Sequence, residues 1–242
     1  MDIKLIIPAR YKSTRFPGKP LVEIKGKSMI NRVWDRAVSG IGVDKVYIAT
    51  DSSLIHEHCR NFTRNIIMTS EKCLTGTDRI AECSLQLKAD IYINIQGDEP
   101  LIDPKDILFL IEKIKQNPNK VYNFMKKITS NEELNSVDIP KVVTDNNNNL
   151  LYMSRLPVPT NSTYESAYKQ VCIYAFPLNA LKFFGIDKSK SKNEVLENIE
   201  ILRLIDNGIN VEMLETKNES YAVDRQEDLE KVLNLIDWKK KI

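Results

Sequence analysis

The sequence predicts an α/β fold in which a mostly parallel sheet is flanked by helices. Strand and helix patterns alternate through the first half of the chain. The predicted strands are short continuous apolar runs, such as Ile3 to Pro8, and runs of this kind are typical of strands that are buried on both faces. With 242 residues, no internal repeat and no clear linker, we expect one domain with an embellishment.

The elements of the first half follow one another at short intervals. We predict strands at 3–8, 45–50, 65–68 and 91–95, and helices at 28–39, 52–62, 77–87 and 104–116. The first helix places its apolar residues on one face: Met29, Ile30, Val33, Trp34 and Ala37. Ligands of such sheets bind at the carboxyl ends of the strands, so we expect chemistry in the loops 9–20 and 96–100 and at Asp51.

The pattern changes after about residue 120. We predict strands at 121–128, 141–144, 150–154, 169–176 and 211–215, with a turn at the four asparagines 146–149. Residues 155–168 are predicted as a loop that leaves the main body. A helix is expected at about 194–207, ended by Gly208, and a final helix at 226–239.

Composition excludes several classes of protein. Hydrophobic residues make up 42% and charged residues 28%, which is typical of a soluble globular protein. The net charge of +2 is too small to indicate nucleic-acid binding, and no apolar run approaches the roughly 18 residues that cross a bilayer. Four cysteines without a CxxC pair, and an N-terminus that leads directly into a strand, predict reduced thiols, no signal peptide and a cytoplasmic location.

The loop after the first strand is rich in groups that bind phosphate. From Ile7 to Leu21 it reads IPARYKSTRFPGKPL, with four cations, two hydroxyls and a glycine. A triphosphate needs converging donors and neutralisation of its charge. The candidate donors are Arg10, Ser13, Thr14, Arg15 and Lys19. By composition alone a solvated surface loop is an equally good interpretation, and the Walker A pattern is absent.

Two aspartates follow predicted strands. Asp98 lies in NIQGDEP at 94–100, and Asp224 lies in VDRQEDL at 223–229. Mg²⁺ prefers one or two carboxylates together with phosphate oxygens, and Asp98 is the preferred ligand. Asp224 has a second interpretation, because its spacing to Glu227 resembles a helix capping box.

Three further groups of polar residues remain as candidates. Glu197, Glu200 and Arg203 would share one face of the predicted helix, for which an exposed ion-paired face is the favoured interpretation. Thr77 in TGTDR at 75–79 is a plausible N-cap of a helix whose N-terminus would favour an anion or a base edge. The pair Ser154-Arg155 is the third group.

In this order the motifs closely resemble those of the 3-deoxy-manno-octulosonate cytidylyltransferases, also called CMP-Kdo synthetases. The family pattern IPARYxSTRxPGKPL appears here as IPARYKSTRFPGKPL. The likeness continues over nearly the whole chain, at 49–51, 75–79, 96–100, 154–155, 173–174, 197–203 and 223–229.

The resemblance implies a Rossmann-like nucleotidyltransferase fold, with a single domain over residues 1–242 and a small dimerisation and sugar-site extension at about 121–176. It implies a homodimer that uses Mg²⁺ and transfers CMP from CTP to the anomeric hydroxyl of a 3-deoxy-2-ulosonic acid, with release of pyrophosphate. The implied catalytic residues are Arg10, Lys19 and Asp98, and the implied metal ligands are Asp98 and Asp224. The implied nucleotide-binding residues are Arg10, Ser13, Arg15, Lys19 and Thr77, and the implied sugar-binding residues are Arg79, Gln96, Arg155, Gln170, Tyr174 and Glu200.

The chain departs from the family pattern mostly in residues that we assign to the sugar side. Gln170 replaces a usual His, Ile201 replaces the Gln of Glu-Gln-Leu-Arg, and Arg225-Gln226 replaces Thr-Pro. Polar groups left without partners discriminate strongly between close analogues, so the acceptor stays open between Kdo and a modified, for example amino-substituted, ulosonic acid. The alternatives are activation of a sialic-acid-like nonulosonate and a non-catalytic sugar-nucleotide binding protein.

Overall fold

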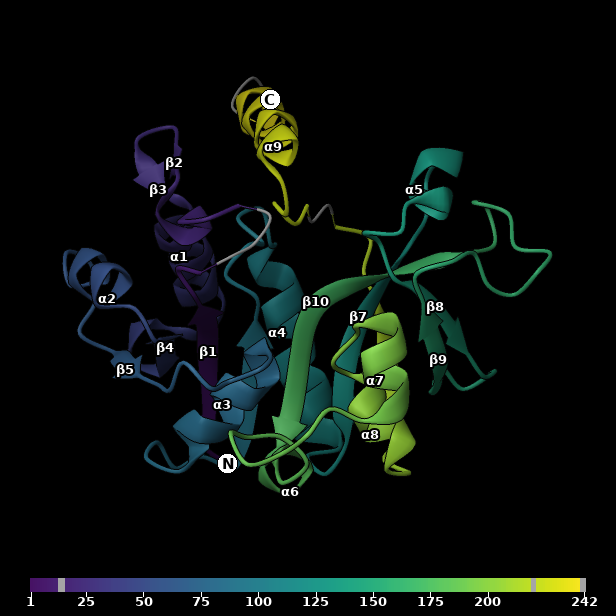
Figure 1. The fold of residues 1–242 in the computed structure, drawn as a ribbon, viewed down its shortest axis with the longest axis horizontal. Coiled ribbons are helices and arrows are strands. Elements are labelled where there is room, and N and C mark those ends of the chain that lie inside the picture. Colours follow the sequence, from purple (N-terminus) through teal and green to yellow (C-terminus); the bar gives the residue numbers. More distant parts are fainter. Residues whose placement is uncertain (13–15, 219–220, 240–242) are drawn as a thin grey trace.

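The computed structural model describes residues 1–12, 16–218 and 221–239. Its central sheet has the strand order β11–β7–β10–β6–β1–β4–β5 (Figure 1). Within it, β10 is antiparallel to β6 and β7, whereas the other neighbours pair in parallel. The strands are β1 (Ile3–Ala9), β4 (Val46–Thr50), β5 (Ile66–Met68), β6 (Ile91–Ile95), β7 (Val121–Lys127), β10 (Tyr168–Pro177) and β11 (Val211–Glu215). The predicted α/β fold with a mostly parallel sheet is confirmed.

Helices cover both faces of the sheet, and successive residues of β1 point into opposite cores. Leu5 and Ile7 pack with α1, α2 and α4, while Ile6 packs with α3, α6 and α8. The bounds are α1 (Met29–Ile41), α2 (Ser53–Cys59), α3 (Gly76–Ser84), α4 (Pro104–Gln116), α6 (Leu178–Leu181) and α8 (Leu202–Asp206). Burial on both faces explains why β1 is apolar from Leu5 onwards, whereas Lys4 near its start is only partly buried.

The region from residue 121 to 176 divides into two parts. β7 and β10 belong to the central sheet, while β8 (Lys141–Thr144) and β9 (Leu150–Ser154) form a hairpin that pairs with the start of β10. This hairpin, the short helix α5 (Asn131–Asn135) and the loop 155–167 project to one side (Figure 1). The projecting part is therefore smaller than the range 121–176.

The prediction of a single helix at 194–207 is wrong. Two short helices, α7 (Lys192–Glu197) and α8, replace it, and Asn198 between them has a φ of 53°. Asn tolerates this left-handed conformation, which ends α7. As a consequence Glu197, Glu200 and Arg203 do not share a helix face, and Arg203 is 1% exposed instead of lying on a solvated surface.

The last helix brings the C-terminal part of the chain back to the sheet. α9 (Gln226–Lys239) contributes Val232 to a small core with Ile24 and Leu101, beside the hairpin of β2 (Glu23–Ile24) and β3 (Lys27–Ser28). Just before α9, the backbone N–H of Val223 donates to the carbonyl of Asp98 at 2.9 Å. This bond holds Asp224 beside the loop that follows β6. No helix among the described residues is long and apolar enough to cross a membrane.

Candidate active site

The loops that follow β1 and β6 lie against each other at the carboxyl edge of the sheet. The two strands pair in parallel, with Ile6 opposite Asn94, so the loops that follow them leave the sheet at the same edge. A side chain at Gly97 would not fit, because its Cβ would lie 2.9 Å from the carbonyl oxygen of Pro8. The glycine therefore lets the loop that carries Asp98 pack directly on the β1 backbone.

Lys19 lies between two carboxylates at this edge. Its Nζ donates to Asp98 Oδ2 at 2.7 Å and to Asp224 Oδ1 at 3.3 Å. Burial lowers the pKa of Lys19, but the two carboxylates outweigh this effect and raise the pKa above its ordinary value of 10.5. Upstream, Gly18 has a φ of 70° and donates its N–H to the carbonyl of Tyr11, which positions the short 3₁₀ helix Lys19–Leu21.

Asp98 and Asp224 fit a magnesium ion. One nitrogen contacts both carboxylates, so the two groups converge on a single point where a cation is stabilised. Mg²⁺ typically takes one or two carboxylates and completes its shell with water and phosphate oxygens. No cluster of three or more His, Cys, Asp or Glu side chains suited to a metal occurs in the described part of the chain, so this site would depend on ligands from the substrate.

The capping interpretation of Asp224 is replaced by a different arrangement. The backbone N–H groups of Asp224 and Arg225 donate to the carboxylate of Asp228, at 3.0 and 2.8 Å. Asp228 thus supplies the carboxylate at the start of α9, rather than the predicted pair of Asp224 and Glu227. The carboxylate of Asp224 faces Lys19 instead.

Two cavities meet above the Lys19 cluster. The first, which we call the β1 chamber, has a volume of about 470 Å³ and includes Lys19, Cys73 and Arg79 in its lining. The second, the β10 chamber, has a volume of about 460 Å³ and includes Lys169, Gln170 and Tyr174. Both chambers share the lining residues Arg10, Thr75, Gly76, Gln96, Asp98, Asn198 and Asp224. Two ligands that occupy the chambers would therefore meet at Arg10 and the two aspartates.

A β-bulge shapes the floor of the β10 chamber. The pairing of β10 with β7 shifts between Val171 and Tyr174, and Asn123 Nδ2 donates to the carbonyls of Val171 and Ile173 at 3.0 and 2.8 Å. Since its nitrogen is used in this way, Asn123 Oδ1 accepts from Gln170 Nε2 at 3.0 Å. The same Gln170 nitrogen donates to the Tyr174 hydroxyl at 3.2 Å. The amide oxygen of Gln170 is then the atom that remains for a ligand.

A carboxylate, Glu200, lines the β10 chamber and contacts Gln96, which lines both chambers. Its two oxygens accept from Gln96 Nε2 and from the backbone N–H of Thr77, both at 3.0 Å. Burial raises the pKa of Glu200 above its ordinary value of 4.5, although the bonds from Thr77 and Thr75 act in the opposite direction. Gly76 leaves room for this arrangement, because a Cβ there would lie 2.6 Å from Gln96 Nε2.

Three of the predicted residues are already engaged within the protein. Thr77 has a fully buried side chain that accepts from Asn94, and the N-cap of α3 is Thr75, so the prediction of Thr77 as the cap is wrong. Arg79 is 3% exposed, donates to Thr69 and pairs with Asp51 at 2.7 Å, beside the β1 chamber rather than the β10 chamber.

Arg155 lines the β10 chamber, but its guanidinium donates to four backbone carbonyls, those of Val137, Asp138, Glu197 and Asn198. Ser13 and Arg15 lie outside the described residues. Arg10, Lys19, Gln96, Asp98, Gln170, Tyr174, Glu200 and Asp224 all line one or both chambers. Ile201 does not belong to the sugar side as we expected: it is 1% exposed and packs in the core around α8.

Sequence reasoning missed Asn123 and the partners of Arg203. Asn123 interrupts an apolar strand, and a polar side chain in such a position needs hydrogen-bond partners, which is a usable signal. Arg203 pairs with Asp78 and Glu194, and all three side chains are buried. No sequence spacing indicates this pairing, since Asp78 lies 125 residues from Arg203.

Known proteins resemble this chain over nearly its full length. A family model described as Cytidylyltransferase matches residues 5–232. The 3-deoxy-manno-octulosonate cytidylyltransferase of Thermodesulfovibrio yellowstonii is 39% identical over 241 residues, which covers 93% of this chain and 94% of that protein. The protein of the same name from Fusobacterium nucleatum is 40% identical over 238 residues, which covers 96% and 95%.

A solved structure is also similar. It is described as CMP:2-keto-3-deoxy-manno-octonic acid synthetase complexed with CTP, and it matches with a TM-score of 0.89 at 36% identity. The match covers 99% of this chain and 100% of that one.

Proposed function

The chain belongs to the cytidylyltransferase family, among the 3-deoxy-manno-octulosonate cytidylyltransferases, and from this premise we propose that it transfers CMP from CTP to the anomeric hydroxyl of a 3-deoxy-2-ulosonic acid and releases pyrophosphate. The observation that carries the proposal is the meeting of two chambers at Asp98 and Asp224, the two carboxylates that contact Lys19. A two-substrate reaction between anions needs such a point, where charge is neutralised from both sides.

We assign CTP to the β1 chamber and the acid to the β10 chamber. The anomeric hydroxyl would then attack the α-phosphorus in line from the β10 side, while pyrophosphate leaves on the other. Arg10 and Lys19 neutralise the triphosphate, and Lys19 can exchange its carboxylate partners for phosphate oxygens because it is a flexible cation with three donors. Mg²⁺ bound by Asp98 and Asp224 would supply Lewis-acid stabilisation of the phosphate charge.

In this proposal, the specificity for the acceptor sugar is set by side chains on the floor of the β10 chamber. Gln170 uses its nitrogen on Asn123 and Tyr174, so its oxygen requires a donor on the sugar. A hydroxyl or an ammonium group meets this requirement, whereas a group that only accepts would leave two acceptors facing each other. We therefore propose that the acid is Kdo or an amino-substituted relative, with a preference set at Gln170.

The projecting part supports an assembly of two copies. Val137, Leu151 and Leu156 lie on or beside the β8–β9 hairpin and are each more than half exposed. Exposed apolar side chains on a part that projects from the body are compatible with an interface, so we propose a homodimer. We also propose that the protein acts in the cytoplasm, as its four cysteines, all free thiols in the structure, support. Light scattering after gel filtration tests the dimer, and a monomer at micromolar concentration would contradict it.

The activity is tested with purified protein, CTP, Mg²⁺ and a panel of acids, by measuring pyrophosphate release. Kdo, amino-substituted ulosonic acids and a nonulosonate form the panel, and Gln170→His serves as the matched variant. We expect turnover with at least one ulosonic acid, and a changed order of preference in Gln170→His. If CTP binds but no acid releases pyrophosphate, the protein is a sugar-nucleotide binding protein and the proposal is wrong.

A further inference from the structure

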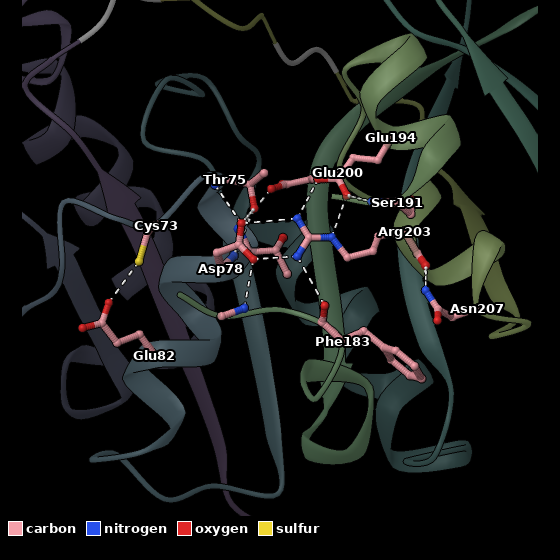
Figure 2. Close-up of polar contacts among 12 residues, drawn as sticks. Cys73, Thr75, Asp78, Glu82, Phe183, Ser191, Glu194, Glu200, Arg203 and Asn207 are labelled. Atoms are coloured by element: carbon pink, nitrogen blue, oxygen red, sulfur yellow. Dashed lines mark hydrogen bonds and ion pairs between the residues drawn. The ribbon is translucent and has the colours of Figure 1, made fainter. Parts of the chain in front are cut away.

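Arg203 is buried between the carboxylates of Asp78 and Glu194 and lines neither chamber (Figure 2). Its Nε and one terminal nitrogen donate to the two oxygens of Glu194 at 2.6 and 2.7 Å. The other terminal nitrogen donates to Asp78 Oδ1 at 2.7 Å. The guanidinium also lies 4.4 Å from the centre of the Phe184 ring. We call Asp78, Glu194 and Arg203 the Arg203 clamp.

Both carboxylates of the clamp begin a helix. Asp78 is the third residue of α3 and forms a capping box with Thr75, and Glu194 is the third residue of α7 and accepts from the backbone N–H of Ser191 at 3.1 Å. Each helix N-terminus carries roughly half a positive charge, which together with Arg203 offsets the two buried carboxylates. The clamp therefore fixes the starts of two helices, far apart in sequence, to a single guanidinium.

The starts of these helices lead directly to the junction of the chambers. In the first turn of α3, Thr75 and Gly76 line both chambers and the N–H of Thr77 donates to Glu200. After α7 the chain runs through Asn198, which lines both chambers, to Glu200, which holds Gln96. Arg203 thus ties the segment that carries Glu200 to the turn that Glu200 must contact.

We propose that Arg203 is a positioning residue, which through Glu194 and Asp78 sets the place of the Asn198–Glu200 segment and so the fit of the acid in the β10 chamber. The inference rests on the proposed function for the identity of the two ligands. Glu194 lines neither chamber, so the α7 side of the clamp can be altered without touching a ligand. Asp78 holds Thr75, which both ligands would meet.

The two carboxylates therefore give different kinetic results. Glu194→Gln should raise the KM for the acid by roughly tenfold, since a small misplacement of a binding group has effects of this order, while the KM for CTP changes less than about twofold. Asp78→Asn should raise both KM values. Arg203→Lys loses the paired contact with Glu194, while a single ammonium can still contact Asp78, so this variant should follow Glu194→Gln.

The matched control is Ile114→Ala, which removes a core side chain of α4 away from both chambers. It should lower the melting temperature and leave both KM values unchanged. A second readout is the hydrogen exchange of the Thr77 amide, which should become faster in Glu194→Gln and Arg203→Lys but not in Ile114→Ala.

The outcomes separate the inference from the proposed function. If Glu194→Gln and Arg203→Lys change both KM values equally, or behave as Ile114→Ala does, Arg203 has only a structural role and the inference is wrong. If no acid supports turnover by the wild-type chain, the proposed function fails, and faster exchange of Thr77 without loss of CTP binding still supports the clamp. Unchanged exchange in both variants overturns it.

Discussion

The protein holds two cations between pairs of carboxylates, and the two clusters differ in burial. Lys19 with Asp98 and Asp224 lies at the junction of the chambers, with side chains that are 13%, 24% and 27% exposed. Arg203 with Asp78 and Glu194 lies behind the chambers, with side chains that are at most 2% exposed. Each cluster joins parts of the chain that are far apart in sequence.

The difference in burial separates an exchangeable cluster from a permanent one. We call Lys19, Asp98 and Asp224 the open cluster, and Arg203, Asp78 and Glu194 the closed cluster. At the open cluster, Lys19 makes one bond to each carboxylate, and water or a ligand can replace either contact. At the closed cluster, Arg203 grips Glu194 with two nitrogens, and no solvent is available to replace a lost partner. The same combination of one cation and two carboxylates is therefore exchangeable in one place, as the proposed chemistry requires, and permanent in the other.

The largest expected effect follows from removing the cation of the closed cluster. Arg203→Met leaves two buried carboxylates without their cation and should lower the free energy of unfolding by about 3–5 kcal/mol. Lys19→Met leaves carboxylates that water can reach and should cost at most about 1 kcal/mol. Urea unfolding of both variants at neutral pH measures the difference. Equal losses would show that burial does not distinguish the two clusters.

The next effect concerns turnover at the open cluster. Asp98→Asn removes one of the two charges that would hold the metal and should lower kcat/KM by about 10²–10³-fold, as expected for loss of a group that stabilises transition-state charge. The melting temperature should change little, because the lost contact with Lys19 is offset by the removal of one of two neighbouring like charges. Pyrophosphate release and thermal unfolding measure the two quantities. Near-normal turnover would remove Asp98 from the proposed mechanism.

The sequence predicted the open cluster far better than the closed one. Lys19, Asp98 and Asp224 each follow a strand or sit in a recognisable loop, and topology brings the carboxyl ends of parallel strands together. Nearly all strands and the helices at 104–116 and 226–239 were also predicted, because they show apolar runs or a clear periodicity.

The closed cluster could not be predicted because its partners are set by tertiary contacts. Asp78 lies in the first turn of the helix predicted at 77–87. Arg203 was predicted on an exposed, ion-paired helix face. Only the turn at Asn198, where a left-handed residue divides the predicted helix, directs Arg203 inward. Helical spacing persists across such a break, so the pattern of 194–207 does not reveal it.

A smaller effect is expected at Gly76, which lies against the Gln96 side chain. In Gly76→Ala the new Cβ would lie 2.6 Å from Gln96 Nε2 and displace the Gln96 side chain from Glu200. The KM for the acid should rise by about tenfold, equivalent to about 1.4 kcal/mol. In a Gln96→Ala background the same substitution should have no further effect, because its clash is with Gln96 itself. Additive effects in the double variant would place the cause elsewhere.

Lys141 is another buried cation, but its partners are neutral, and its stability contribution should therefore depend on pH differently from that of Lys19. Its Nζ donates to the carbonyls of Ser136, Ile139 and Arg155, and burial, aided by the charge of Arg155, lowers its pKa to about 8. Lys19, in contrast, has a raised pKa because of its carboxylates. The partner thus decides the direction: carboxylates raise the pKa of a buried lysine, whereas neutral carbonyls do not overcome the loss of water.

The two lysines should therefore respond differently between pH 8 and 10.5. Over this range the unfolded chain still binds the proton of Lys141 while the native chain has released it, so native stability relative to Lys141→Met rises with pH. The contribution of Lys19 is fully present below 10.5 and is lost only as the pH rises through its higher native pKa, so stability relative to Lys19→Met should stay level until then. Urea midpoints of the three proteins at pH 7.5, 8.5 and 9.5 measure both trends. If the stability difference between the wild-type protein and Lys141→Met does not change with pH, the pKa of Lys141 is not lowered in the native protein, and the prediction is wrong.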